Sequence, residues 1–314
     1  MSKNGKALLN RRQIVQMILL TVGAVGLYAA AQTLPQSLAP ERPADVLAQL
    51  RGGVMPPDFC AVSEGGFTEV RGDRSPIRFA LEPTGPVQPG ETTQLVLSMT
   101  FPDGRPIRAE AIRPTHGELV HLLAISPTLA HYAHLHPRMD PDSGQWTVDF
   151  TPEEPGRYRF FVEWMADRTG RMVQSGADLP VGGSAEWDYF APDRSAVEKG
   201  PWRFTFTADE ALIAGRPSVV RLRMAALDGR VVPLEPVMEA YAHVVAFDRS
   251  REGFAHFHPL EEGLDWQPDP REPEMTFVFF TPRAGPYILW AQVKIDGQEI
   301  FVPFQVEVGV RRRG

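Results

Sequence analysis

The stretch PGETTQLVLSMTFPDGR at residues 89–105 returns in altered form as AGRPSVVRLRMAALDGR at residues 214–230. In both copies a glycine turn precedes a run rich in apolar residues, and Asp-Gly-Arg follows it. Further along, the matching segments Phe150-Thr-Pro and Phe280-Thr-Pro each precede a glycine and a tyrosine. An internal repeat of this length indicates one structural unit written twice. We place the two repeats at residues 76–182 and 201–309.

Each repeat contains about seven short β-rich runs separated by turn signals. The 27 Gly and 30 Pro residues of the 314-residue chain favour short elements joined by turns over long helices. Seven short strands of this kind predict an immunoglobulin-like sandwich. The predicted fold class is therefore all-β, with two tandem immunoglobulin-like β-sandwich domains after an N-terminal export helix. There is no glycine-rich phosphate loop and no strand–helix alternation, which argues against a nucleotide enzyme.

The N-terminal residues 1–31 predict a signal peptide or a signal anchor. Lys3, Lys6, Arg11 and Arg12 precede the apolar run IVQMILLTVGAVGLYAAA at residues 14–31. A basic segment followed by an apolar one is the pattern of an export signal. The run is long enough to remain as a membrane anchor, and its small residues at the end also fit cleavage. Either way, we expect the body in the periplasm or on the extracytoplasmic face of the inner membrane.

The remaining segments carry less information. We expect an extended arm at residues 32–75, a linker at 183–200 and a basic tail at 310–314. The single cysteine, Cys60, excludes an intramolecular disulfide framework and any multi-cysteine metal site. Its own role, as a soft ligand, a redox thiol or an inert thiol, stays open.

The net charge of −7 argues against nucleic acid as a partner. A partner protein of the cell envelope or membrane is possible on the basis of the export signal, and the chain itself contacts the membrane if the N-terminal helix is not cleaved. No nucleophile–base pair and no motif of paired carboxylates is identifiable, so we do not expect an enzyme.

Six of the eight histidines follow one pattern, in which twelve residues separate the first from the second and one residue separates the second from the third. They are His121, His134 and His136 in the first repeat, and His243, His256 and His258 in the second. Residues i and i+2 of a strand point to the same face, so the last two of each set share a face. If the segments pair as an antiparallel hairpin, the first histidine lies opposite the third, or opposite the second after a shift of two residues. Three imidazoles would then converge in each repeat.

Three converging imidazoles are a ligand set for copper or zinc, and we expect one ion per repeat. Met99 and Met224 occupy equivalent positions, and a thioether near the imidazoles would favour copper, although both methionines also suit a hydrophobic core. His116 and His131 are either extra ligands or exposed loop residues. The alternative for the six histidines is a structural cluster without metal, in a membrane-anchored interaction subunit of an envelope complex.

The segments Tyr132-Ala-His-Leu-His-Pro and Phe254-Ala-His-Phe-His-Pro resemble the F-A-H-L-H-P signature of exported bacterial β-sandwich domains. Those domains are grouped loosely with YtkA-like and copper-resistance CopC-like proteins. The resemblance covers both repeats, and it implies an extracytoplasmic immunoglobulin-like fold with a link to copper. The function that we predict is an extracytoplasmic carrier, buffer or delivery module for copper, or less favoured for zinc.

Overall fold

The computed structural model describes residues 12, 66–70, 75–184, 194–261 and 266–310. The predicted export helix, most of the arm with Cys60, and the basic tail after residue 310 lie outside these residues. Among the described residues, no helix is long and apolar enough to cross a bilayer. The structure that they form is all-β, with 19 strands and the short 3-10 helix η3 (Ala109–Ala111). The prediction of an all-β fold is confirmed for these residues.

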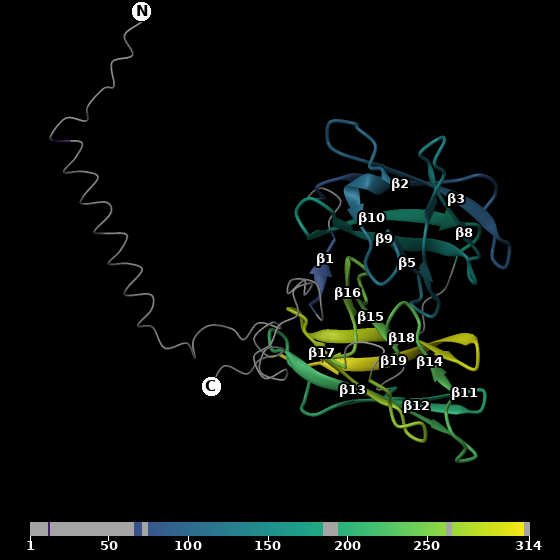
Figure 1. The fold of residues 1–314 in the computed structure, drawn as a ribbon, viewed down its shortest axis with the longest axis vertical. Coiled ribbons are helices and arrows are strands. Elements are labelled where there is room, and N and C mark those ends of the chain that lie inside the picture. The colour runs from purple at the N-terminus through teal and green to yellow at the C-terminus, as the bar shows by residue number, and fades with distance from the viewer. Residues whose placement is uncertain (1–11, 13–65, 71–74, 185–193, 262–265, 311–314) are drawn as a thin grey trace, which may run out of the picture. The chain divides into compact units, whose positions relative to one another are not determined.

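The first repeat folds into two facing sheets (Figure 1). One has the order β2-β3-β8-β7, and the other has the order β10-β9-β5-β6, with β4 also paired to β9. The bounds are β2 (Arg78–Pro83), β3 (Thr93–Thr100), β4 (Ile112–Arg113), β5 (His121–Ile125), β6 (Tyr132–Leu135), β7 (Arg138–Met139), β8 (Trp146–Phe150), β9 (Gly156–Ala166) and β10 (Arg171–Val181). Alternate residues of β3 are buried, as in a strand with one face toward a core. Leu95, Leu97 and Met99 lie on that face.

The second repeat has the same plan. One sheet has the order β11-β12-β13-β17, and the other has the order β1-β16-β15-β18-β14, with β19 also paired to β18. The bounds are β1 (Thr68–Glu69), β11 (Ala196–Lys199), β12 (Trp202–Ala208), β13 (Ser218–Ala226), β14 (Leu234–Glu235), β15 (His243–Asp248), β16 (Gly253–Phe257), β17 (Glu274–Phe279), β18 (Gly285–Ile295) and β19 (Gln298–Val308). Phe204, Leu222 and Met224 are buried in its core.

Two strands lie inside segments that the sequence predicted as connections. β1 belongs to the predicted arm, and it pairs with β16. β11 belongs to the predicted linker, and it pairs with β12. Both strands are short, at two and four residues, and edge strands of this length give little periodicity in a sequence.

Strands β5 and β15 are buried on both faces, unlike β3. One face of each points into the core of its own repeat, where Leu122 and Val244 pack. Leu123 on β5 and Val245 on β15 belong instead to a shared cluster that draws apolar side chains from both repeats. The histidine-bearing sheets of the two repeats therefore pack on each other, and the histidines lie where those sheets meet.

Candidate metal centre

The first set of histidines converges as the hairpin geometry predicted. β5 and β6 pair Leu122 with Leu135, and the same register carried one step further places His121 opposite His136. One nitrogen from each of His121, His134 and His136 lies within 4.8 Å of the others. His121 and His134 are buried, and His136 is partly buried.

The second set repeats this arrangement on β15 and β16. Val244 pairs with Phe257, so His243 comes opposite His258 by the same continuation. One nitrogen from each of His243, His256 and His258 again lies within 4.8 Å of the others. Each repeat thus holds a histidine triad, which we call the first site (His121, His134, His136) and the second site (His243, His256, His258).

The two sites adjoin each other, which the sequence did not predict. The ring centroids of His134 and His256 are 5.3 Å apart, and those of His121 and His256 are 6.0 Å apart. These separations are close to those within the sites, where the centroids of His121 and His134 are 5.3 Å apart and those of His243 and His256 are 5.9 Å apart. The six histidines form one cluster because β5 and β15 turn the same face toward the opposite repeat.

A backbone carbonyl fixes the tautomer of the first histidine in each site. His121 Nε2 lies 3.1 Å from the Thr115 carbonyl oxygen, and His243 Nε2 lies 3.0 Å from that of Val237. A carbonyl oxygen only accepts, so Nε2 carries the proton in both rings, and the Thr115 hydroxyl oxygen, 3.2 Å from His121 Nε2, accepts from the same N–H. The Nδ1 atoms of His121 and His243 therefore keep their lone pairs. A hydrogen bond at the outer nitrogen that orients the ring is typical of metal-ligating histidines.

The middle histidine of each site is held by the opposite repeat. His134 Nδ1 lies 2.9 Å from Gln292 Oε1, and His256 Nδ1 lies 3.1 Å from Glu163 Oε1. Glu163 pairs across strands with His121, and Gln292 pairs with His243, so these two residues are structural counterparts. Each therefore reaches across to support the other repeat's site.

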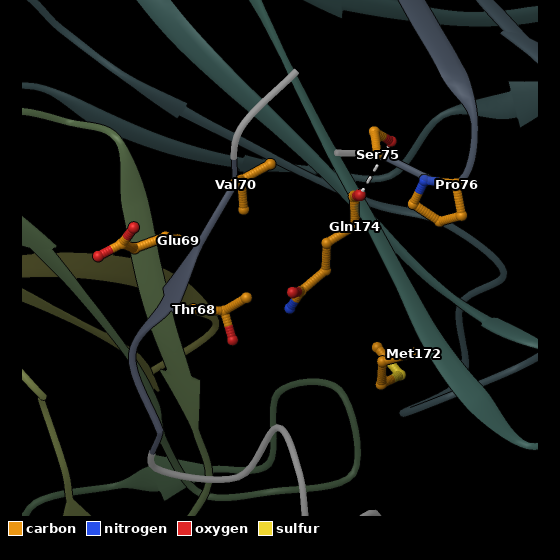
Figure 2. Close-up of a pocket in the computed structure, with 7 residues that line it drawn as sticks. All are labelled: Thr68, Glu69, Val70, Ser75, Pro76, Met172 and Gln174. Carbon is orange, nitrogen blue, oxygen red and sulfur yellow. Dashed lines mark hydrogen bonds between the residues drawn. The ribbon is translucent and has the colours of Figure 1, made fainter. Parts of the chain in front are cut away.

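The orientations of both supporting side chains are also fixed. Gln292 donates from Nε2 to Glu299 Oε2 at 2.8 Å, so its oxygen faces His134. Gln174 donates from Nε2 to the second oxygen of Glu163. His134 and His256 therefore donate from Nδ1, and their Nε2 lone pairs face the cluster. Gln174 also lines a pocket with Thr68 and Met172, which Figure 2 shows beside β1.

These tautomers leave nitrogen lone pairs facing one another. His121 Nδ1 and His134 Nε2 are 3.1 Å apart, and in the tautomers set by the Thr115 carbonyl and the Gln292 amide oxygen neither nitrogen carries a proton. His243 Nδ1, His256 Nε2 and His136 Nε2 are buried and have no hydrogen-bond partner among the described residues. Two nitrogens that each lie about 2.0–2.1 Å from one tetrahedral ion are about 3.3 Å apart. The donor set and its spacing therefore fit a metal ion that imidazole binds, such as copper or zinc.

Burial keeps these rings neutral. It lowers the pKa of His121 to about 3, and it holds the pKa of His134, His243 and His258 well below the usual value. The pKa of His136 is lowered for the same principal reason, burial. Neutral imidazole is the form that binds metal, so the rings are ready to act as ligands.

Glu163 brings a buried carboxylate to this centre. Burial opposes its ionisation, but the hydrogen bonds from His256 and Gln174 lower its pKa overall. An ionised carboxylate behind His256 increases the basicity of that ring toward a metal.

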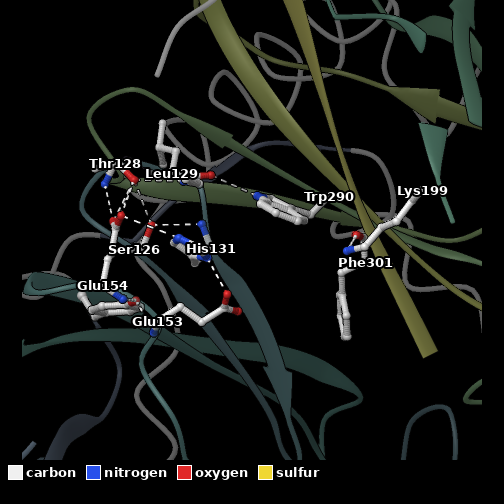
Figure 3. Close-up of polar contacts among 11 residues, drawn as sticks. Ser126, Thr128, Leu129, His131, Glu153, Glu154, Lys199, Trp290 and Phe301 are labelled. Carbon is white, nitrogen blue, oxygen red and sulfur yellow. Dashed lines mark hydrogen bonds and ion pairs between the residues drawn. The ribbon is translucent and has the colours of Figure 1, made fainter. Parts of the chain in front are cut away.

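The two further histidines of the first repeat behave differently from each other. His131 Nδ1 lies 2.9 Å from Glu153 Oε2, in the polar network around Ser126, Thr128 and Glu154 that Figure 3 shows. His116 instead joins the cluster, with its ring centroid 3.9 Å from that of His258. Burial lowers the pKa of His116 to about 4. The sequence left its role open because a contact between a loop and the other repeat has no signature in the spacing.

The methionines do not take part in the sites. Met99 on β3 and Met224 on β13 are buried in the two sandwich cores, in the sheets that lack the histidine triads. They are core residues, so the prediction that their thioethers lie near the imidazoles and favour copper is wrong.

Comparison with known proteins gives one family. A family model described as a domain of unknown function (DUF8832) matches residues 72–179 and 197–309, which agrees with the internal repeat. No curated protein matches the chain.

The chain is also similar to several solved structures. A Salmonella alpha-2-macroglobulin mutant is 11% identical with a TM-score of 0.23, and the alignment covers 76% of this chain and 16% of that one. The fibronectin(III)-like modules of Clostridium thermocellum CbhA are 9% identical with a TM-score of 0.19, covering 74% and 95%. The ICAM-5 D1–D4 ectodomain fragment is 16% identical with a TM-score of 0.24, covering 75% and 54%.

Proposed function

Because the chain belongs to DUF8832, a family described as a domain of unknown function, we propose its function from the histidine centre: it binds metal ions, one in each triad. The observation that carries this proposal is the contact between His121 Nδ1 and His134 Nε2. Their outer nitrogens are committed to a carbonyl and an amide oxygen, so two lone pairs face each other at 3.1 Å. Two lone pairs at this distance repel, and a cation between them turns the contact into an attraction.

Copper is the ion that we favour over zinc. Imidazole suits both ions, and nitrogen sites generally bind Cu²⁺ more tightly than Zn²⁺. The resemblance to copper-associated exported domains supports the same choice. A three-histidine site keeps a position open for a further ligand, which suits an ion that is passed on. We therefore propose a carrier, buffer or delivery protein, and not an enzyme.

The place of action follows from the N-terminal segment. We propose that the body after residue 31 lies outside the cytoplasm, because Lys3, Lys6, Arg11 and Arg12 precede the apolar run. There each repeat would be an immunoglobulin-like domain of its own, and the partner would be an envelope or membrane protein that gives or receives the ion. A reporter fused to the C-terminus should be active only outside the cytoplasm, and cytoplasmic activity would contradict this topology.

The competing function is a structural or interaction subunit whose histidines only hydrogen-bond. It has support in the carbonyl, amide and carboxylate partners of His121, His134 and His256. Those partners occupy only one nitrogen of each ring, however. Among the described residues, His243 Nδ1 and His256 Nε2 have no hydrogen-bond partner.

Metal analysis separates the two functions. The protein is exported to the periplasm, purified without chelator, and its copper and zinc contents are measured beside those of H134A and H256A. We expect up to two ions per chain, and the loss of about one ion in each variant. Protein that stays metal-free after incubation with either ion, and variants that lose only thermal stability, would favour the structural subunit.

A further inference from the structure

The first and second sites share their triads but differ in the turns beside them. His121 follows the turn Thr115–Glu118, and His243 follows the turn Val237–Ala240, each closed by two backbone hydrogen bonds. The second residue of the first turn is His116, with φ of 51°. Its counterpart in the second turn is Met238, with φ of 48°. One turn therefore carries an imidazole where the other carries a thioether.

His116 belongs to the first repeat, but its ring lies closer to the second site than to His121. Its ring centroid is 3.9 Å from that of His258 and 5.8 Å from that of His243, but 6.5 Å from that of His121. The nitrogens that lie within 4.8 Å of one another at the second site come from His243, His256 and His258, so the side-chain torsion angles of His116 must change to aim one of its nitrogens at an ion there. The turn holds His116 at the second site, although its own strand leads into the first.

The residues that accept a hydrogen bond from the middle histidines also favour tighter metal binding at the second site. The second site has the carboxylate of Glu163 behind His256, and the first has the neutral amide of Gln292 behind His134. A carboxylate that accepts the outer N–H of a ligating histidine raises the basicity of the ring, and removing such a partner typically costs 10–100-fold in metal affinity. The second site therefore has both an additional imidazole and the stronger support.

We propose that the two sites are unequal: the second is a closed four-histidine site completed by His116 from the first repeat, and the first is an open three-histidine site. Sites with four protein ligands retain their ion, whereas a site with three keeps a position for an incoming ligand. The second site thus fills first and holds its ion, and the first exchanges its ion with a partner. This inference rests on the proposed function, since it assigns different roles to the same two triads.

The retained ion would also join the two repeats. His243, His256 and His258 come from the second repeat, while His116 and Glu163 come from the first. An ion in the second site binds both repeats at once, so it stabilises their packing as well as the triad.

Zinc titration of the full chain against a chromophoric competing chelator tests the inference, because Zn²⁺ has no redox chemistry to complicate the measurement. We expect two ions with affinities that differ by at least about tenfold. The variant is His116→Asn, because Asn tolerates the left-handed backbone of this position. It should lower the affinity for the more tightly bound ion at least about tenfold and leave the affinity for the other ion unchanged. Met238→Asn is the matched control at the equivalent turn position, and it should leave the tighter ion unchanged.

A second measurement uses the unaltered protein, so it does not depend on the folding of a variant. Histidines are carbethoxylated with diethyl pyrocarbonate, and the modified residues are identified by mass spectrometry after zero, one and two equivalents of Zn²⁺. We expect the first equivalent to protect His116, and the second to protect His136 of the first site.

The possible failures are distinguishable. Two ions of equal affinity, a His116→Asn variant that binds like the unaltered protein, or a His116 that stays reactive with both ions bound would overturn the unequal pair and leave the metal-binding function intact. A chain that binds no Zn²⁺ and no copper ion would overturn the proposed function itself.

Discussion

The first and second sites are built from the same triad, yet their surroundings differ at two pairs of equivalent positions, His116 against Met238 and Glu163 against Gln292. A hairpin in each repeat places the three histidines, and a carbonyl from the preceding turn sets the tautomer of His121 or His243. The residue behind the middle histidine is Gln292 for the first site and Glu163 for the second. A duplicated unit can therefore keep the geometry of its ligands while substitutions outside the triad set how strongly each copy binds.

Loss of a middle histidine should have the largest effect. Replacing His134 or His256 with Ala leaves two histidines of that triad, joined in the second site by His116, and we expect the affinity of the altered site to fall on the order of 100-fold or more. The reason is that each ligand supplies a substantial share of the binding free energy. Titration of each variant should show one intact site and one lost site. His131→Ala, which removes the contact with Glu153, is the control and should leave both sites intact.

Exchange of the supporting residues should have the next largest effect. Glu163→Gln should weaken the second site by roughly 10–100-fold, because His256 loses its carboxylate partner. Gln292→Glu should strengthen metal binding at the first site, because His134 then gains a carboxylate partner. Repulsion from the nearby Glu299 carboxylate opposes part of this gain. The double exchange should bring the two affinities closer together. Identical affinities in all these variants would show that the supporting residues do not distinguish the sites.

Acid should destabilise the metal-free protein. In the unfolded chain a histidine takes up its proton near pH 6.5, whereas in the folded chain His116 resists protonation to about pH 4 and His121 to about pH 3. The unfolded state therefore binds more protons between these values, and the free energy of unfolding falls as the pH is lowered from about 6.5 toward 3. Urea denaturation at a series of pH values measures this. Constant stability between pH 7 and pH 4 would contradict the burial of neutral rings.

A bound ion should raise the melting temperature. Free ion at about 100 times its Kd stabilises the folded state by about 2.7 kcal/mol per site. For a chain of this size that corresponds to a rise of several degrees, measured by calorimetry with and without Zn²⁺. The rise should be smaller in H256A than in H134A if the second site binds more tightly. An equal rise in a variant that lacks both middle histidines would place the ion elsewhere.

The core methionines should have the smallest effect. Met99→Leu and Met224→Leu are close in volume, so we expect each to cost less than about 1.5 kcal/mol of stability. Neither side chain belongs to a triad, so the copper content of the purified protein should not change. A loss of copper in either variant would restore a role for the thioether in metal binding.

The sequence was sufficient to predict that the three histidines of each hairpin converge, but not that the two repeats bring their histidines together. The period-two spacing of His134 and His136, and the position of His121 across a polar turn, are enough to predict the hairpin and two alternative registers, and the structure has the one that places His121 opposite His136. The all-β class and the repeat followed from turn residues and matching segments in the same way.

The packing of one repeat on the other was not predictable in this way. It brings Glu163 to His256 and Gln292 to His134, over separations of 93 and 158 residues. Nothing in the spacing of a glutamate on β9 marks it as a partner for a histidine on β16. The complete burial of β5 and β15 is visible in their unbroken apolar runs, and such runs were a signal that both faces of these strands are covered.

The most direct test of the account is a crystal structure of the chain loaded with Zn²⁺ or Cu²⁺, with anomalous diffraction to locate the ions. The account predicts two ions within the interface of the repeats, one about 2.0–2.1 Å from His121 Nδ1 and His134 Nε2, and the other at the same distance from His243 Nδ1 and His256 Nε2. A fully loaded crystal with ions bound only away from the triads, and with the histidine nitrogens still facing one another, would contradict it.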